Sequence, residues 1–283
     1  MIYILMSIIE YPTYCINLDR CPERKKVMER QFKKYNVNYT FCKAIDANDI
    51  SFEYEKDDKR QQERKGHYRK NGLYFKVHVK SLSMWWKKSH GWLGCVLSHL
   101  IYLMMASQKK EDIICMLEDD ISFQYYNKWE KSIKSIVENA PKDWSILKLH
   151  CSNLHCLKTH IKSKNPYINI INMSYNDKMS FWSSGFYIIN KKGMKEVLNK
   201  FYDKKNNCLN LFGDYPVSDK IFLDIPGVCY YSIPLVKNNN NEFNFKSTIE
   251  SNEEAELQGI RFVDEYYKNM KTKKKNYLLF NHK

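Results

Sequence analysis

The chain has 283 residues, of which 43% are hydrophobic and 14% aromatic, enough for the core of one large domain or two small ones. Its 9 glycines and 7 prolines exclude collagen-like and proline-rich chains, and its aromatic content argues against intrinsic disorder. The net charge of +14 favours polyanionic partners, namely nucleic acid, an anionic membrane surface or a phosphorylated ligand.

The 9 cysteines are scattered without any Cys-x-x-Cys pair, so we expect reduced thiols and not a disulfide framework. Residues 1–9 are apolar, but this stretch is short and lacks both a basic leading region and a small-residue cleavage site. No later segment reaches the ~18 uninterrupted apolar residues of a membrane span. We therefore expect a cytoplasmic protein with neither a signal peptide nor a transmembrane segment.

The first predicted elements form a βαβ unit. Residues 14–18 predict a short buried strand, Pro22 suits the first turn of a helix with an apolar stripe, and residues 39–42 predict a second strand. Two strands joined by a helix within about thirty residues imply a parallel sheet, whose ligands lie at the carboxyl ends of the strands.

Residues 51–90 are charged and aromatic with no clean period, and we expect a long loop or excursion from the main domain there. A helix is predicted at 97–107, followed by a continuously apolar central strand at 112–117. The remaining predictions are helices at 128–138, 192–201 and 253–268, and strands at 144–149, 186–189 and 228–233.

Three adjacent carboxylates, Glu118, Asp119 and Asp120, directly follow the central strand. Because these charges repel one another, we expect a cation to compensate them. Mg²⁺ and Mn²⁺ prefer carboxylate oxygens and keep positions open for substrate phosphates. The alternative is an exposed acidic loop that needs no metal, but the buried strand before the triplet favours the metal.

A second group of potential ligands has the residue types of a zinc site but not its spacing. No second paired set completes four ligands, so we do not expect zinc to bind there. The group consists of His150, Cys151, His155, Cys156 and His160.

Arg20 and Arg24 follow the first predicted strand, where a guanidinium group could bind a phosphate. The alternative is surface pairing with Glu23 or Glu29. The chain contains no Gly-x-x-x-x-Gly-Lys loop, Gly-x-Gly-x-x-Gly fingerprint or Gly-x-Ser-x-Gly elbow, so nucleoside triphosphatase, dehydrogenase and serine hydrolase functions lack their markers.

Trp85, Trp86 and Trp92 lie among Lys87, Lys88 and His90. These rings could stack on sugars or bases, or they could equally cap the core.

Six blocks follow one another between residues 14 and 236, and together they resemble the motifs of glycosyltransferase family 25. That family includes bacterial lipooligosaccharide galactosyltransferases and collagen hydroxylysine galactosyltransferases. The blocks are Cys15-Ile-Asn-Leu-Asp-Arg20, Phe41-Cys-Lys-Ala-Ile-Asp46, Gly91-Trp-Leu-Gly-Cys-Val-Leu-Ser-His99, Met116-Leu-Glu-Asp-Asp-Ile121, Ser184-Gly-Phe-Tyr-Ile-Ile-Asn190 and Pro216-Val-Ser-Asp219.

The resemblance implies a GT-A-type α/β fold, with a central, mostly parallel sheet flanked by helices. It divides the single domain at 1–283 into a donor-binding half at 14–125, an acceptor half at 126–236 and a polar tail at 237–283 with a terminal helix. It also implies a UDP-sugar donor and inversion at the anomeric carbon.

The resemblance further assigns roles to residues. Asp120 would bind Mn²⁺ (or Mg²⁺) directly, with Glu118 or Asp119 assisting, and the catalytic base would be Asp219, with Asp214 and Asp224 as alternatives. His99 could touch a phosphate or be a buried structural histidine. The expected donor-binding residues are Asn17, Leu18, Arg20, Arg24, Ala44, Asp46, Ser98, His99, Glu118 and Asp119.

The expected activity is transfer of a hexose to a glycan or protein hydroxyl, with galactose favoured and glucose or N-acetylhexosamine possible. A bacterial or viral role in glycan synthesis, such as lipopolysaccharide biosynthesis, fits this expectation. Residues 51–90 and the tail resemble the family least, so the acceptor is left open. Two alternatives are a basic nucleic-acid-binding module, which would bind with steep salt dependence, and a catalytically silent scaffold.

Overall fold

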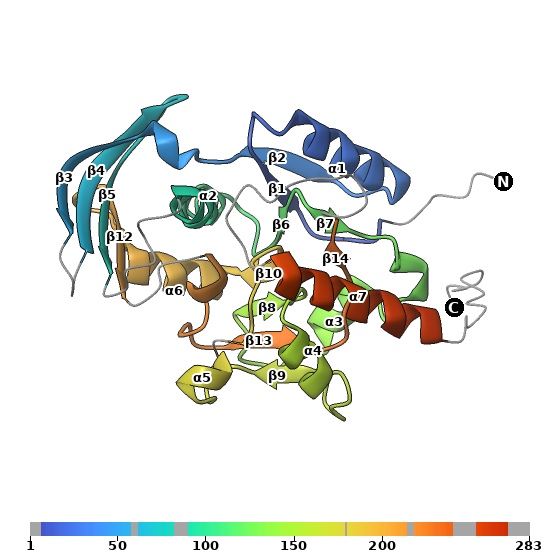
Figure 1. Ribbon diagram of the computed structural model, residues 1–283. Helices are drawn as coiled ribbons and strands as arrows, with labels where there is room; N and C mark the ends of the chain where they lie inside the picture. The colour runs from blue at the N-terminus through green and yellow to red at the C-terminus, as the bar shows by residue number, and fades with distance from the viewer. Residues whose placement is uncertain are drawn as a thin grey trace.

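The computed structural model describes residues 7–57, 62–81, 90–178, 180–213, 218–239 and 253–270. Its central sheet has the strand order β2-β1-β6-β10-β8-β13-β9 (Figure 1). The strands β2, β1, β6, β8 and β13 run in one direction, while β10 and β9 run against it, so the expectation of a mostly parallel sheet is confirmed. The bounds are β1 Thr13–Asn17, β2 Tyr39–Lys43, β6 Ile113–Glu118, β8 Ile146–Lys148, β9 Tyr167–Asn169, β10 Phe186–Asn190 and β13 Val228–Tyr231.

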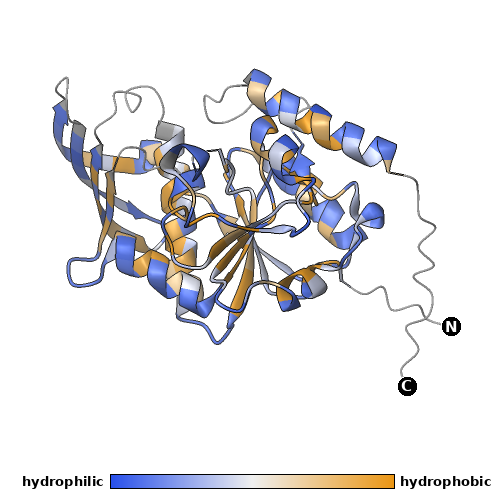
Figure 2. Ribbon diagram, turned by 90° about the horizontal axis from the view of Figure 1, so that it is seen from below, coloured by the Kyte–Doolittle hydropathy of each residue, from blue (hydrophilic) through white to orange (hydrophobic). Residues whose placement is uncertain are grey.

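The central strands are buried throughout their length. All five residues of β1 are buried, as are the four inner residues of β6, and Figure 2 shows apolar strands in the middle of the molecule. Parallel strands need cover on both faces, which is why they are continuously apolar. Helices supply that cover: α1 Pro22–Lys34, α2 His90–Ser107, α3 Ile133–Glu138 and α6 Lys191–Phe201.

A second sheet of five strands, ordered β11-β12-β5-β4-β3, lies beyond α2 and α6 (Figure 1). Its strands β3, β4 and β5 form an antiparallel meander, and β12 joins parallel to β5. The bounds are β3 Ile50–Asp57, β4 Gln62–Lys70, β5 Leu73–Ser81, β11 Tyr202–Asp203 and β12 Cys208–Gly213.

The expectation at 51–90 was a long loop or an excursion from the main domain. The second sheet shows that the loop alternative was wrong for residues 51–57 and 62–81, which form three strands and their turns. In β5, Phe75, Val77 and Val79 are buried, while the residues between them are partly or fully exposed. In β4 the corresponding buried positions hold Gly66 and Tyr68. Glycine carries no hydrophobic side chain, and the open face of the sheet is charged. The alternation of apolar and polar residues that predicts a strand is therefore not visible in the sequence of β4. Residues 82–89 lie outside the described part.

Most other predicted elements are confirmed, including the βαβ unit, in which β1 pairs parallel with β2. Helix α2 begins seven residues earlier than expected, and α3 begins five residues later. The shorter elements are η1 Ala47–Asp49, β7 Ile121–Ser122, η3 Tyr126–Lys128, α4 Leu154–His160, α5 Tyr175–Lys178, η4 Ser218–Lys220 and β14 Lys237–Asn238.

The terminal helix α7, Glu253–Asn269, is anchored to the core and contacts α4. Val263 and Tyr267 are buried, and the Tyr267 ring stacks on Tyr125 with centroids 4.3 Å apart. The segment before it is also fixed, because β14 pairs with β7 directly after the acidic triplet. Within the described ranges, no helix combines the length and apolar character needed to cross a lipid bilayer. All nine cysteines are free thiols.

Candidate active site

A pocket opens at the carboxyl ends of β1, β2 and β6, where the first turns of α1 and α2 also converge. This is the edge at which an open α/β sheet binds its ligands. The pocket is lined by Ile16, Leu18, Arg20, Arg24, Ala44, Ile45, Asp46, Ala47, Gly91, Gly94, Cys95, Ser98, Glu118, Asp119 and Asp120.

The structure therefore gathers the residues that the sequence singled out. Nine of them line the pocket: Leu18, Arg20, Arg24, Ala44, Asp46, Ser98, Glu118, Asp119 and Asp120. Asn17 and His99 are buried behind the wall and hydrogen-bond to carboxylates of the triplet.

Asp119 is fully engaged by the protein. Its two carboxylate oxygens accept hydrogen bonds from Asn17 Nδ2 at 2.7 Å and from Arg24 Nη1 at 3.0 Å. Burial raises the pKa of Asp119, and the positive charge of Arg24 opposes that rise. Since Arg24 is itself buried against Asp119, it is an internal ion-pair partner, and Glu23 instead pairs with Lys26. Asp119 thus fixes the first turn of α1 against the end of β6.

Asp120 is in the opposite situation. Its Oδ1 atom is buried and has no hydrogen-bond partner within the described residues. Burial, together with the nearby charge of Glu118, raises the pKa of Asp120 to about 7. The Nη1 atom of Arg24 lies 4.0 Å from the other oxygen, Oδ2. A buried carboxylate oxygen without a partner fits a divalent cation, because hard cations take oxygen ligands.

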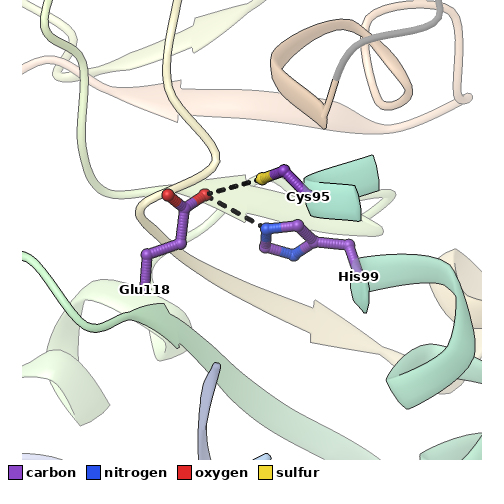
Figure 3. Close-up of side chains that lie close together, drawn as sticks. All are labelled: Cys95, His99 and Glu118. Carbon is purple, nitrogen blue, oxygen red and sulfur yellow. Dashed lines mark hydrogen bonds and ion pairs between the residues drawn. The ribbon is translucent and has the colours of Figure 1, made fainter. Parts of the chain in front are cut away.

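Glu118 is held by residues of α2 and of the segment before β10. Its Oε1 atom accepts hydrogen bonds from Ser184 Oγ at 2.5 Å and from His99 Nε2 at 3.1 Å, and Cys95 Sγ lies 3.9 Å away (Figure 3). Burial raises the pKa of Glu118, but the contacts with His99 and Ser184 outweigh it and lower the pKa overall. His99 is in turn oriented by the Tyr187 hydroxyl, 3.0 Å from its Nδ1 atom. Glu118 is therefore ionised and fixed in place.

The spacing of the block at 91–99 has a structural reason. Gly94 and Ser98, four residues apart, share one side of α2 and face the loop after β2. Ser98 Oγ accepts a hydrogen bond from the Ile45 backbone nitrogen at 2.8 Å, and a Cβ atom at Gly94 would lie 2.5 Å from the Ile45 oxygen. One position further along, Cys95 and His99 face Glu118. The helix therefore joins the loop after β2 to the triplet after β6.

Asp219 lies in η4, beside this network and not in the pocket lining. Its Oδ1 atom is 3.5 Å from Ser184 Oγ, which also bonds Glu118, and its backbone oxygen is 3.5 Å from Lys148 Nζ. Burial raises the pKa of Asp219. Asp224, by contrast, is 63% exposed and pairs with lysines on the surface. Of the three candidates for the base, the structure places only Asp219 near the triplet among the described residues; Asp214 lies outside them.

The sequence analysis missed Ser184 and Lys148. Ser184 opens the block at 184–190, but its link to Glu118 depends on a contact between residues 66 positions apart. Lys148 lies within an apolar strand and is buried, with its Nζ donating to the Phe181 oxygen at 2.5 Å. A lysine inside an apolar run was the available signal, since buried charges need partners.

The group at 150–160 does not gather into a metal site. His150 bonds the Ser183 hydroxyl, His160 stacks on Phe181, and His155 is exposed. In the part of the chain that the structure describes, the ligand atoms that converge belong instead to Cys95, His99 and Glu118.

The remaining predicted residues are placed as follows. Arg20 is half-exposed and forms an ion pair with Asp46 at the pocket rim. Trp92 is half-buried in the first turn of α2. Trp85 and Trp86, with Lys87 and Lys88, lie outside the described residues.

Comparison with known proteins identifies the family. The profile described as glycosyltransferase family 25 (LPS biosynthesis protein) matches residues 10–215. The chain belongs to glycosyltransferase family 25. Its α/β architecture, with a large mixed sheet flanked by helices, is consistent with the GT-A-like fold that the sequence implied.

Three relatives match about two thirds of the chain. The chain is 27% identical over 196 residues to a glycosyltransferase 25 family member of Aedes aegypti and 25% identical over 192 residues to one of Drosophila melanogaster. It is 22% identical over 187 residues to procollagen galactosyltransferase 1-A of Xenopus laevis. The matches cover 66%, 68% and 66% of this chain but 28% of each relative, so the chain spans about a quarter of their length.

Proposed function

We propose that this member of glycosyltransferase family 25 is a metal-dependent, inverting hexosyltransferase that uses a UDP-sugar as donor. The observation that carries the proposal is the buried Oδ1 atom of Asp120, which has no hydrogen-bond partner among the described residues and lies in a pocket at the carboxyl ends of three parallel strands. Family membership supports sugar transfer, and the chemistry of this site supports a diphosphate donor held with a cation.

The donor would lie across the pocket. The loop after β2, which contains Ala44 and Asp46, would contact the nucleoside, and Arg20 would bind the diphosphate with its guanidinium group. Asp120 and Glu118 would hold a divalent cation, Mn²⁺ or Mg²⁺. When bound, that cation would neutralise the charge that develops on the departing diphosphate. Asp119 keeps its structural role.

The acceptor hydroxyl would attack the anomeric carbon from the face opposite the diphosphate. Its oxygen forms the new glycosidic bond, the bond to the diphosphate breaks, and the hydroxyl proton passes to a base. Asp219 is our candidate for this base, because burial raises its pKa and so makes its carboxylate a better proton acceptor. Ser184, between Glu118 and Asp219, would position both carboxylates.

For the transferred sugar we propose a favoured hexose, and for the acceptor only a chemical class. Galactose is favoured because one relative is named a procollagen galactosyltransferase, and the family description refers to LPS biosynthesis. A hydroxyl of a glycan or of a protein would be the acceptor, and a role in glycan synthesis in the cytoplasm would fit.

The test is release of UDP from a panel of UDP-sugars, with and without Mn²⁺, for the wild type, Asp120→Asn and Asp224→Asn. We expect one sugar to be hydrolysed slowly in a Mn²⁺-dependent manner, a loss of about 1,000-fold or more in Asp120→Asn, and little change in Asp224→Asn. Equal rates with and without metal would contradict the role of Asp120. If no UDP-sugar is turned over and UDP does not bind, the transferase proposal is wrong.

A further inference from the structure

Three potential metal ligands of different chemistry, Cys95, His99 and Glu118, lie close together beside the pocket (Figure 3). Cys95 Sγ and His99 Nε2 project from α2 toward Glu118 Oε1 at the end of β6. The sulfur lies 3.9 Å and the imidazole nitrogen 3.1 Å from that oxygen, and all three atoms lie within 4.8 Å of one another. A thiol, an imidazole and a carboxylate form a softer ligand set than the carboxylates of the acidic triplet.

Two of these separations are close to those around a tetrahedral zinc ion. Zinc binds nitrogen and oxygen at about 2.0–2.2 Å and sulfur at about 2.3 Å. At tetrahedral angles the ligands are therefore about 3.3 Å apart for nitrogen and oxygen, and about 3.5 Å apart for sulfur and oxygen. The observed distances of 3.1 and 3.9 Å differ from these by a few tenths of an ångström, so small side-chain adjustments would complete the site.

The surroundings of the three ligands are those of a metal site. Tyr187 OH contacts His99 Nδ1 at 3.0 Å, and such a partner fixes the ring so that Nε2 faces the metal. Ser184 Oγ holds Glu118 in the same way at 2.5 Å. Cys95 and Glu118 both line the pocket, which gives a cation a route to the site.

We propose that Cys95, His99 and Glu118 bind Zn²⁺ or a similar thiophilic cation, at a site that adjoins the proposed hard-cation site at Asp120 and has Glu118 in common with it. Three protein ligands leave a fourth position for water or for a ligand oxygen. On binding, the cation replaces the Cys95 thiol proton, which passes to solvent, and it takes the place of the hydrogen bond between His99 and Glu118. The proton leaves His99 Nε2, and the neutral ring carries its proton on Nδ1 instead, where it donates to Tyr187 OH. Because Glu118 is shared with the proposed donor site, zinc would compete with transfer; this consequence alone rests on the proposed function.

The site is tested by titrating the full chain, freed of metal, with Co²⁺ and recording the absorption spectrum. We expect one equivalent to give a thiolate-to-cobalt charge-transfer band and the intense visible bands of tetrahedral Co²⁺, both abolished by one equivalent of Zn²⁺. In Cys95→Ser the charge-transfer band should disappear, whereas Cys21→Ser, which removes another half-exposed thiol near the pocket, should retain it. Asp120→Asn should also retain it.

Circular dichroism of each variant would show that a missing band does not come from unfolding. The proposal is overturned if the wild type gives no charge-transfer band, or if folded Cys95→Ser gives the same spectrum as the wild type. A second variant, His99→Gln, keeps a polar side chain and should weaken Co²⁺ binding at least about tenfold; unchanged affinity would exclude His99 as a ligand.

Inhibition supplies a separate readout. Zn²⁺ should inhibit UDP release by the wild type in the presence of Mn²⁺, and Cys95→Ser, compared with its own zinc-free rate, should require at least about tenfold more zinc. Equal sensitivity of the two proteins would contradict competition at this site. If the protein neither releases nor binds UDP, the proposed function fails while the cobalt spectra still decide whether the site exists.

Discussion

The two sheets of the molecule place their polar residues in opposite ways. In the seven-stranded sheet the strands are buried and the polar groups are concentrated at their carboxyl ends, where Asn17 and Glu118 terminate β1 and β6. In the five-stranded sheet one face is buried, and the other exposes aromatic and basic residues such as Tyr74, Lys76 and Phe212. Both sheets contribute to one hydrophobic core.

This difference shows which part of the fold can hold catalytic side chains in fixed positions. Strand ends fixed by neighbours on all sides can hold carboxylates in defined positions, whereas an exposed face of mobile lysine side chains cannot. We therefore expect substitutions at the strand ends of the seven-stranded sheet to change the rate of the reaction. Substitutions on the open face of the five-stranded sheet should leave UDP release unchanged.

Among substitutions outside the proposed metal ligands, the largest effect should come from the candidate base. Asp219→Asn should lower the rate of transfer to an acceptor by about 100- to 10,000-fold, because the hydroxyl proton loses its acceptor. Asp224→Asn, a matched change at an exposed carboxylate, should stay within about twofold of the wild type. Initial rates under saturating donor would measure both. Similar losses in the two variants would contradict the assignment.

The next effect concerns stability and has a defined pH dependence. Burial raises the pKa of Asp120 from 3.8 in the unfolded chain to about 7 in the folded protein. The folded state thus favours the protonated form of Asp120, and ionisation lowers the free energy of unfolding. This loss begins above pH 3.8, grows as the pH rises to about 7 and is complete above pH 7. Its upper limit is about 4 kcal/mol.

Metal-free Asp120→Asn should therefore be more stable than the metal-free wild type above pH 7, and this difference should shrink as the pH falls toward 4. Urea unfolding at several pH values measures it. If the variant is less stable than the wild type at pH 8, Asp120 is not an uncompensated charge.

A smaller effect on stability is expected when a tightly packed glycine is replaced, and the effect on UDP binding should differ between a glycine near the pocket and one far from it. Gly94→Ala places a Cβ atom 2.5 Å from the Ile45 oxygen, and Gly259→Ala places one 2.2 Å from the Ser152 oxygen, beyond the pocket. Each overlap should cost about 1–3 kcal/mol of unfolding free energy. Only Gly94→Ala should also weaken UDP binding by the folded protein. Equal UDP affinity in both variants would show that the loop after β2 does not contact the donor.

The smallest effects should come from the open face of the five-stranded sheet. Tyr74→Ala and Phe212→Ala remove exposed aromatic side chains, and each should change the unfolding free energy by no more than about 0.5 kcal/mol. UDP release without an acceptor should be unchanged in both. A clear loss of UDP release in either variant would show that the five-stranded sheet also takes part in the reaction.

The same distinction explains what could be predicted from the sequence. The buried strands before Asn17 and Glu118 have continuous apolar runs, so their ends and the acidic triplet could be located. The five-stranded sheet could not, because Gly66 and an exposed charged face conceal its alternation.

The different roles of Asp119 and Asp120 could not be predicted from the sequence either. Arg24, 95 positions before Asp119 in the chain, binds that carboxylate, whereas Asp120 Oδ1 has no hydrogen-bond partner in the part of the chain that the structure describes. Which carboxylate is engaged depends on the long-range contact between Arg24 of α1 and Asp119, and no local sequence pattern predicts that contact.

The most direct test of the central claim is calorimetry of UDP binding with and without Mn²⁺, for the wild type and Asp120→Asn. The account predicts that Mn²⁺ strengthens UDP binding at least about tenfold in the wild type and has no effect in the variant. UDP binding that is equally tight without Mn²⁺, or equally enhanced by Mn²⁺ in Asp120→Asn, would contradict a metal-assisted donor site at Asp120.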